Sequence, residues 1–257
     1  MCTAFFRKGN DVITGFNFDM NEGYLSYAPI IEKDRVMVSM RFPQEFVDTL
    51  PPGVKMKNCV RLIQGVSSGG YAAGQLGNMD FFKLPSAFEE NMLTIDQLTD
   101  DFVTERYSRE RLMSELETHD VTNIPNAPDN PTPPLALHSL FVDPEGNAVF
   151  VEPGNGYAVI KEKYFTVTNF SVLEPPLDLN DDKCGYYGVD RYRKSVTRLK
   201  NSGDDFSAAD GLALLNEVRQ TGDWATRFSF VYSLRENAVY YCFDGDFGSV
   251  QVHRFDE

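Results

Sequence analysis

The 257-residue sequence has few of the residues on which many active sites depend. It contains three histidines, and none of them has a partner at the spacing of a metal-binding pair. Its four cysteines are far apart and form no Cys-x-x-Cys motif: Cys2, Cys59, Cys184 and Cys242. These absences argue against a zinc site and against a disulfide framework, and they predict free thiols in a reducing compartment. We therefore expect no metal ion and no other cofactor.

Two further absences concern membranes and nucleic acids. No stretch approaches the roughly 20 apolar residues of a membrane-spanning helix, and the N-terminus lacks the basic and apolar regions of a signal peptide. Positive charge is scarce, since 24 Lys and Arg face 38 Asp and Glu, which gives a formal net charge of −14. A chain this acidic repels phosphate groups. The sequence thus predicts a cytoplasmic protein that binds neither nucleic acid nor membrane.

The residues that are present predict a single folded domain over residues 1–257. Hydrophobic residues make up 42% and aromatic residues 13%, which is enough for a sizeable core. Strand-like segments fill the first 80 residues, resume after the proline-rich loop at 123–134, and return at the C-terminus. Helices are predicted over 94–116, where Thr94 and Gln97 have capping-box spacing, and from Ser207. Because strands and helices do not alternate, this order predicts an α+β fold with antiparallel sheets.

One motif suggests a serine nucleophile. Residues 65–69 read GVSSG and match the Gly-x-Ser-x-Gly elbow, with Ser67 as nucleophile and His138 or His253 as base. That elbow needs a helix directly after the serine, but three glycines follow at positions 70, 74 and 77. The alternative interpretation, which we favour, is a flexible turn between strands.

Cys2 offers a different nucleophile. Cysteine is small enough for the initiator methionine to be removed, which would leave Cys2 with a thiol and a free amine on one residue. An α-amine has an unperturbed pKa of about 7.7–8.0, so it can act as general base for its own thiol. Such a site needs no histidine. The alternative is a cysteine that occupies the first strand by chance.

Several motifs in a fixed order carry a family resemblance. The chain begins Met-Cys-Thr, and its second strand ends in a Gly-Phe-Asn-Phe-Asp turn at residues 15–19. Later come a glycine-rich segment at 70–81, a hairpin at 139–152, a strand ending in Thr-Asn at 168–169, and DRYRKS at 190–195. Together they resemble the choloylglycine hydrolase family of N-terminal-nucleophile hydrolases, which includes bile salt hydrolases and penicillin V acylases. The resemblance extends over essentially the whole chain.

The resemblance implies a fold and a site. The fold is a four-layer αββα sandwich of two antiparallel sheets, and the reaction is hydrolysis of a linear amide through a thioester on Cys2. Asp19 is expected to hydrogen-bond the Cys2 amine, and Arg191 to lower the pKa of the thiol. Asn169 and an amide near Asn78 are expected to stabilise the oxyanion.

Four aromatic residues are predicted to line the substrate pocket, with core packing as the alternative: Phe16, Phe18, Tyr24 and Phe81. Phe16 also stands where the family usually has arginine, which removes a positive charge beside the nucleophile. Only 21 residues separate Asn169 from Arg191, fewer than in bile salt hydrolases. The hairpin that supports their tetramer is therefore expected to be trimmed, which favours a monomer or dimer over a tetramer.

Two other functions fit the same resemblance. A family member with Phe16 in place of arginine and with Met1 retained would be catalytically impaired and would act in binding or assembly. An acyltransferase would use the same residues but pass the acyl group to an amine instead of water. The sequence names neither the acyl half nor the amine half of the substrate.

Overall fold

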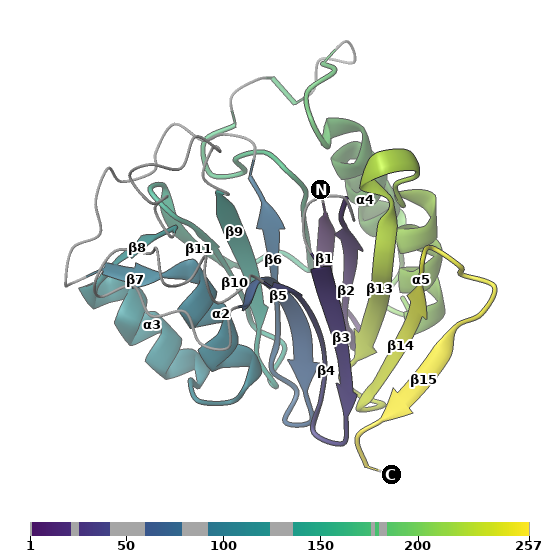
Figure 1. Ribbon diagram of the computed structural model, residues 1–257, viewed down its shortest axis with the longest axis horizontal. Helices are drawn as coiled ribbons and strands as arrows, with labels where there is room; N and C mark the ends of the chain where they lie inside the picture. Colours follow the sequence, from purple (N-terminus) through teal and green to yellow (C-terminus); the bar gives the residue numbers. More distant parts are fainter. Residues whose placement is uncertain are drawn as a thin grey trace.

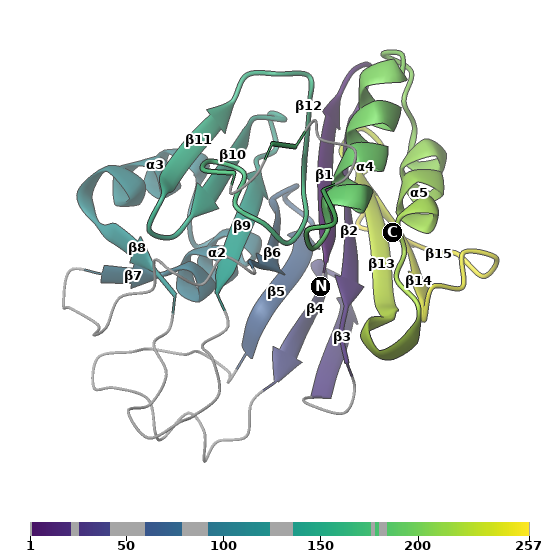
Figure 2. The same ribbon diagram turned by 90° about the horizontal axis from the view of Figure 1, so that it is seen from above.

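The computed structural model describes residues 2–21, 26–41, 60–78, 92–123, 136–175, 178–179 and 184–256. Two large sheets lie face to face, with helices on the outer side of each (Figures 1 and 2). The predicted four-layer αββα architecture is therefore confirmed. The loop expected at 123–134 lies almost wholly outside the described residues.

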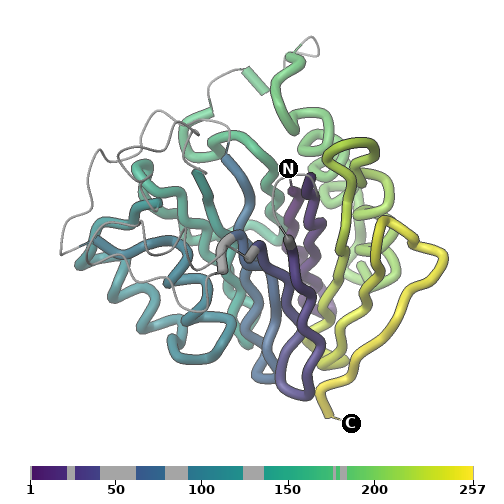
Figure 3. The backbone as a smooth tube through the Cα atoms, viewed as in Figure 1, coloured from purple at the N-terminus to yellow at the C-terminus, as the bar shows by residue number. Residues whose placement is uncertain are grey.

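The first sheet has six antiparallel strands in the order β12-β1-β2-β13-β14-β15. The strand at the N-terminus, β1, lies inside this sheet between β12 and β2, so the residue that precedes it is placed among neighbouring strand ends. The two chain termini lie at opposite ends of the sheets in Figure 3. The bounds are β1 (Thr3–Lys8), β2 (Val12–Asp19), β12 (Tyr164–Val167), β13 (Thr226–Ser233), β14 (Ala238–Phe243) and β15 (Gln251–Arg254).

The second sheet has seven antiparallel strands in the order β11-β10-β9-β6-β5-β4-β3. A separate parallel pair is formed by β7 and β8. The bounds are β3 (Ser26–Glu32), β4 (Arg35–Arg41), β5 (Val60–Ser67), β6 (Ala72–Gly77), β7 (Met92–Thr94), β8 (Asp120–Thr122), β9 (Leu137–Val142), β10 (Ala148–Glu152) and β11 (Gly156–Ile160).

Each sheet has its own pair of helices (Figure 1). The seven-stranded sheet is covered by α2 (Ile95–Val103), which packs on β5, β6 and β9, and α3 (Arg109–Thr118) lies beside α2. The six-stranded sheet is covered by α4 (Val189–Asn201) on β12 and β1, and by α5 (Ala208–Glu217) on β2 and β13. A 3₁₀ turn, η3 (Gly222–Trp224), precedes β13. None of the described helices is long and apolar enough to span a membrane.

The main core lies between the two sheets. Phe16 is fully buried there, and its ring stacks at 5.0 Å from that of Phe230. On the opposite sheet it rests against Gly74, where a Cβ atom would come within 2.1 Å of the Phe16 ring. The glycine at position 74 therefore makes room for a large ring between the sheets, as close packing requires.

The helix predicted over 94–116 is in fact two helices. Its start is confirmed, since the Thr94 hydroxyl accepts a hydrogen bond from the Gln97 N–H at 3.1 Å. The chain then breaks at Glu105, which has a φ of 57°, and α3 begins with Ser108 as its cap. A residue with positive φ cannot continue a right-handed helix. The predicted helix at Ser207 is confirmed, with a complete capping box between Ser207 and Asp210.

Candidate active site

Cys2 lies directly before β1 and is fully buried. The antiparallel register pairs Ala4 with Val167, so continuing it by two residues places Asn169 opposite Cys2. The Cys2 backbone N–H donates a hydrogen bond to Asn169 Oδ1 at 3.1 Å. The thiol Sγ lies 4.0 Å from the backbone oxygen of Asp19. Strand pairing alone therefore brings together three residues that are far apart in sequence.

Arg191 joins these residues from the helix layer. It lies in the first turn of α4 and is almost completely buried. Nη1 donates to the backbone oxygen of Cys2 at 2.7 Å and to Thr3 Oγ1 at 2.8 Å. Nη2 donates to Asn169 Oδ1 at 2.6 Å. The same guanidinium is 3.6 Å from Asp19 Oδ2. The Arg191 side chain thus holds the backbone of Cys2 and also contacts Asp19 and Asn169.

Asp19 ends β2 as a buried carboxylate. Thr226, its partner in β13, donates a hydrogen bond to Oδ1 at 2.6 Å. Burial raises the pKa of Asp19 to about 6, although the N-terminal amine, Arg191 and Thr226 all act to lower it. Thr226 was not predicted from the sequence, because a threonine in a strand carries no signal of its partner. The site therefore holds a carboxylate that titrates near neutral pH.

Asn169 connects the two sheets. Because arginine can only donate, the contact with Arg191 fixes Oδ1 toward Arg191 and Cys2 and directs Nδ2 the other way. Nδ2 donates to the backbone oxygen of Gly77, at the end of β6, at 2.6 Å. A side-chain amide has two N–H groups. The bond to Gly77 uses one of them and leaves a second for the predicted oxyanion role.

Asn78 follows Gly77 and so lies at the edge of the site. Its backbone N–H already donates to Ala136 O at 2.8 Å. Its side-chain Nδ2 donates to Glu152 Oε1 at 3.1 Å. The backbone N–H of Asn78 is therefore used in strand pairing in this structure, and the oxyanion role expected for an amide near Asn78 stays a prediction.

Arg191 acts to lower the pKa of the Cys2 thiol, as predicted. Burial has the larger effect, however, and raises the pKa of this thiol above its ordinary value. The predicted free thiols are confirmed for Cys2, Cys184 and Cys242. Cys59 lies outside the described residues.

The predicted aromatic lining is only partly described. Phe16 and Phe18 are fully buried in the core, and the Phe18 ring lies 6.0 Å from that of Tyr27. In this structure the two phenylalanines pack between the sheets and present no surface to a ligand. Tyr24 and Phe81 lie outside the described residues.

The serine alternative is wrong. Ser67 ends β5, and the chain turns directly into β6, with the Ser67 hydroxyl accepting from the Tyr71 N–H at 3.3 Å. The elbow needs a strand-to-helix turn. His138 instead places Nε2 2.8 Å from Thr168 O, and His253 lies on β15 at the far edge of the other sheet.

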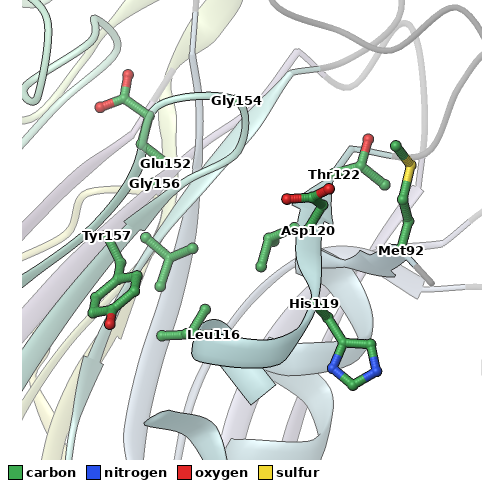
Figure 4. Close-up of a pocket in the computed structure, with 11 residues that line it drawn as sticks. Met92, Leu116, His119, Asp120, Thr122, Glu152, Gly154, Gly156 and Tyr157 are labelled. Atoms are coloured by element: carbon green, nitrogen blue, oxygen red, sulfur yellow. The ribbon is translucent and has the colours of Figure 1, made fainter. Parts of the chain in front are cut away.

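A pocket of about 380 Å³ lies elsewhere, on the outer side of the seven-stranded sheet (Figure 4). Its lining comes from the end of α3, from β8 and from the β10–β11 hairpin, and Cys2 is not among the described residues that form it. Within the described parts of the chain, no three His, Cys, Asp or Glu side chains gather to hold a metal ion. The lining includes Leu116, His119, Asp120, Thr122, Glu152 and Tyr157.

Comparisons with known proteins establish the fold. No protein-family model matches the sequence, and no curated protein matches it. Among solved structures, a cysteine-to-alanine mutant of a conjugated bile acid hydrolase from Clostridium perfringens is 14% identical, with a TM-score of 0.64 over 100% of this chain and 93% of that one. An arginine-to-leucine variant of the same enzyme is 14% identical, with a TM-score of 0.62 over 99% and 93%.

A more distant match extends the likeness. Penicillin V acylase from Agrobacterium tumefaciens is 15% identical, with a TM-score of 0.52 over 94% of this chain and 83% of the other. The resemblance predicted from the sequence is thereby confirmed at the level of the fold: the chain has the αββα fold of conjugated bile acid hydrolase and penicillin V acylase.

Proposed function

We propose that the protein is a choloylglycine hydrolase family member that hydrolyses the C–N bond of a linear amide, with Cys2 as nucleophile after removal of Met1. The observation that carries this proposal is the cluster around Cys2. In a fold shared with a bile acid hydrolase and a penicillin acylase, the residue at the head of β1 is a cysteine held by Asn169 and Arg191, with Asp19 beside them. These are the residues that the family resemblance named.

The reaction proceeds in two steps. Once Met1 is removed, the Cys2 amine accepts the thiol proton, and the thiolate attacks the amide carbonyl carbon. The amine then delivers the proton to the leaving nitrogen as the C–N bond breaks, which leaves a thioester. A water molecule, deprotonated by the same amine, attacks the thioester carbonyl carbon. The C–S bond then breaks, which releases the acid, and the amine returns the proton to the Cys2 thiolate. No metal or organic cofactor takes part.

The surrounding residues have separate roles. Arg191 holds the Cys2 backbone through its carbonyl and neutralises Asp19. The Asn169 side chain positions the Cys2 nitrogen with Oδ1 and offers its second Nδ2 hydrogen to the oxyanion. Removal of one oxyanion donor typically costs about 3 kcal/mol in the barrier.

A second candidate is a family member without catalysis that binds a ligand or assembles with other chains. Two observations favour it. Cys2 is fully buried with a raised thiol pKa, and Phe16 places a fully buried aromatic ring where the family has arginine. The two candidates differ in the state of the N-terminus and in the reactivity of the thiol.

Intact mass and alkylation distinguish these candidates. We expect the purified protein to lack Met1, and we expect iodoacetamide to modify Cys2 faster than Cys242. Cys242 is a matched internal control, because it is also a buried free thiol, and burial raises its pKa to about 11. Peptide mapping after alkylation gives both rates in one sample, and a panel of linear amides follows. Retained methionine together with equal rates would contradict hydrolysis and support the second candidate.

The pKa of Asp19 gives a pH prediction. Protonation of the Cys2 amine already lowers amide hydrolysis as pH falls, and below about pH 6 the decline should steepen by about a further tenfold per pH unit, because protonation of Asp19 removes the charge that faces Arg191. Stability should not fall with it. A carboxyl pKa raised from 3.8 to about 6 means that the folded state binds this proton more tightly, so this group favours folding at low pH and loses that contribution as pH rises through about 6.

The measurement is a profile of kcat/KM between pH 4.5 and pH 8, with the unfolding temperature recorded at each pH. Asp19→Asn is the control and should remove the limb near pH 6 from whatever activity remains. A decline whose slope does not steepen near pH 6 would show that the protonation state of Asp19 does not govern the reaction.

A further inference from the structure

A second buried carboxylate lies next to the site. Glu152 is the last residue of β10 and is fully buried. Its Oε1 accepts hydrogen bonds from Nδ2 of Asn78 at 3.1 Å and from Nδ2 of Asn155 at 3.2 Å. Its Oε2 accepts from the backbone N–H groups of Val172 at 3.2 Å and Leu173 at 3.1 Å. Four donors from three different segments thus meet on one side chain.

The chemistry of these contacts calls for a carboxylate. All four partners donate, and only a carboxylate offers acceptors on both of its oxygens. A glutamine of the same shape would turn an NH₂ group toward two of the four donors. Burial of a carboxylate is costly unless it is fully hydrogen-bonded, as it is here. The geometry therefore depends on the identity of residue 152 as well as on its size.

The segments that Glu152 joins are those that flank Cys2. One contains Gly77 and Asn78 at the end of β6, and the other follows Asn169. Asn169 Nδ2 bonds directly to Gly77 O, and Glu152 ties the same two segments together through Asn78 and Val172. His138 contacts the second segment just before Asn169, with Nε2 2.8 Å from Thr168 O. The asparagine is therefore fixed from both sides along the chain.

Glu152 also lines the pocket of Figure 4, but it is turned toward the site. The figure shows its carboxylate directed away from Leu116 and Tyr157. Three of the four hydrogen bonds of the carboxylate go to the two segments described above, and the fourth goes to Asn155 in the β10–β11 turn. The side chain is thus committed to holding the protein together and is not presented to a ligand of that pocket.

We propose that Glu152 is a positioning residue for the Cys2 site, which sets the place of Asn169 relative to the cysteine by holding the segments after β6 and after Asn169. This inference rests on the proposed amide hydrolysis. A displacement of about 1 Å in a catalytic group can cost roughly a hundredfold in rate. Loss of the four-donor arrangement should therefore slow the chemical step and leave substrate binding largely intact.

The test compares Glu152→Gln with Asp143→Asn. Asp143 is a matched control at the opposite end of the β9–β10 hairpin: it is buried, and it accepts from the backbone N–H groups of Glu145 and Asn147 and from Nδ2 of Asn147. We expect Glu152→Gln to lower kcat roughly 10- to 100-fold with KM changed less than about threefold. Asp143→Asn should leave kcat within about twofold at a comparable loss of unfolding temperature.

Glu152→Asp is the second variant, because it keeps both acceptor oxygens on a shorter side chain, and we expect an intermediate kcat. Wild-type kcat in Glu152→Gln would overturn the proposal, as would equal losses of kcat in Glu152→Gln and Asp143→Asn. Failure of both Glu152 variants to fold, with Asp143→Asn folded, would assign Glu152 to stability alone. Cys2→Ala, assayed beside them, tests the proposed function separately, since its retained activity would refute the nucleophile whatever Glu152 does.

Discussion

Replacement of Cys2 with alanine should abolish amide hydrolysis, with a loss of kcat of roughly a thousandfold or more. The reason is chemical, because without Sγ no thioester can form and the α-amine has no proton to accept from a thiol. The fold should survive. Cys2 is buried in the core between the sheets, but its backbone contacts to Asn169 and Arg191 use main-chain atoms that alanine retains. We expect a stability loss of only about 1 kcal/mol.

The measurement is kcat for the most active amide found in the panel, on protein whose intact mass shows that Met1 is absent. Cys242→Ala provides the matched control. Cys242 is a second fully buried free thiol in the same sheet, on β14, and its loss should leave kcat unchanged. Hydrolysis by Cys2→Ala at the wild-type rate would rule out Cys2 as the nucleophile and would mean that another side chain attacks the amide.

The sequence predicted those parts of the fold that depend on local patterns. Helix α2 begins after Thr94 and α5 begins after Ser207. Each of these capping side chains accepts a hydrogen bond from the N–H three residues later, so the signal for each helix start is local. In contrast, α4 was not predicted. It follows Gly188, which has a φ of 82° and offers no side-chain cap, and two of its four buried residues are Arg191 and Ser195. Its apolar residues do recur at helical spacing, at Val189, Tyr192, Val196 and Leu199, so what the sequence lacked was a start signal from a capping side chain.

Cys2 was a candidate nucleophile from its place after Met1, but the rest of the site was predictable only through the family resemblance. That resemblance named Cys2, Asp19, Asn169 and Arg191, and the structure brings all four together from β2, α4 and the ends of β1 and β12. It did not indicate Thr226 or Glu152, because their roles depend on partners far away in sequence and their residue types are common. The resemblance also noted Phe16 but could not show that its ring packs on Gly74.

Asp19 and Arg191 form a buried charge pair in the site, and the N-terminal amine also acts to lower the pKa of Asp19. Asp19 and Arg191 are both almost completely buried, and the carboxylate keeps a pKa of about 6 even with the guanidinium 3.6 Å away. The family resemblance places Phe16 where an arginine is usual, and a phenylalanine adds no second positive charge. The pair should therefore be unusually sensitive to loss of its cation.

Replacement of Arg191 with leucine should destabilise the protein by about 3–5 kcal/mol, because it leaves the Asp19 carboxylate buried without its counter-charge. The unfolding temperature should drop by roughly 6–20 °C for a domain of this size. Hydrolysis should fall at least about a hundredfold, since the Cys2 carbonyl and Asn169 Oδ1 lose the donors that position them. Arg198→Leu is the control. It lies on the same helix, is partly exposed and pairs with Glu217, and should change stability by less than about 0.5 kcal/mol.

Varying the pH separates two causes of the stability loss in Arg191→Leu: loss of the positive charge that faces Asp19, and loss of packing. Without Arg191, an effect that lowers the pKa of Asp19 is removed, so its pKa should rise above about 6. A carboxyl whose pKa is raised in the folded state favours folding at low pH, so Arg191→Leu should recover part of its unfolding temperature between pH 7.5 and pH 5. Asp19→Asn in the Arg191→Leu background should recover a similar part at pH 7.5. A variant as stable as Arg198→Leu, or one whose deficit does not change with pH, would show that the Arg191–Asp19 pair does not govern stability.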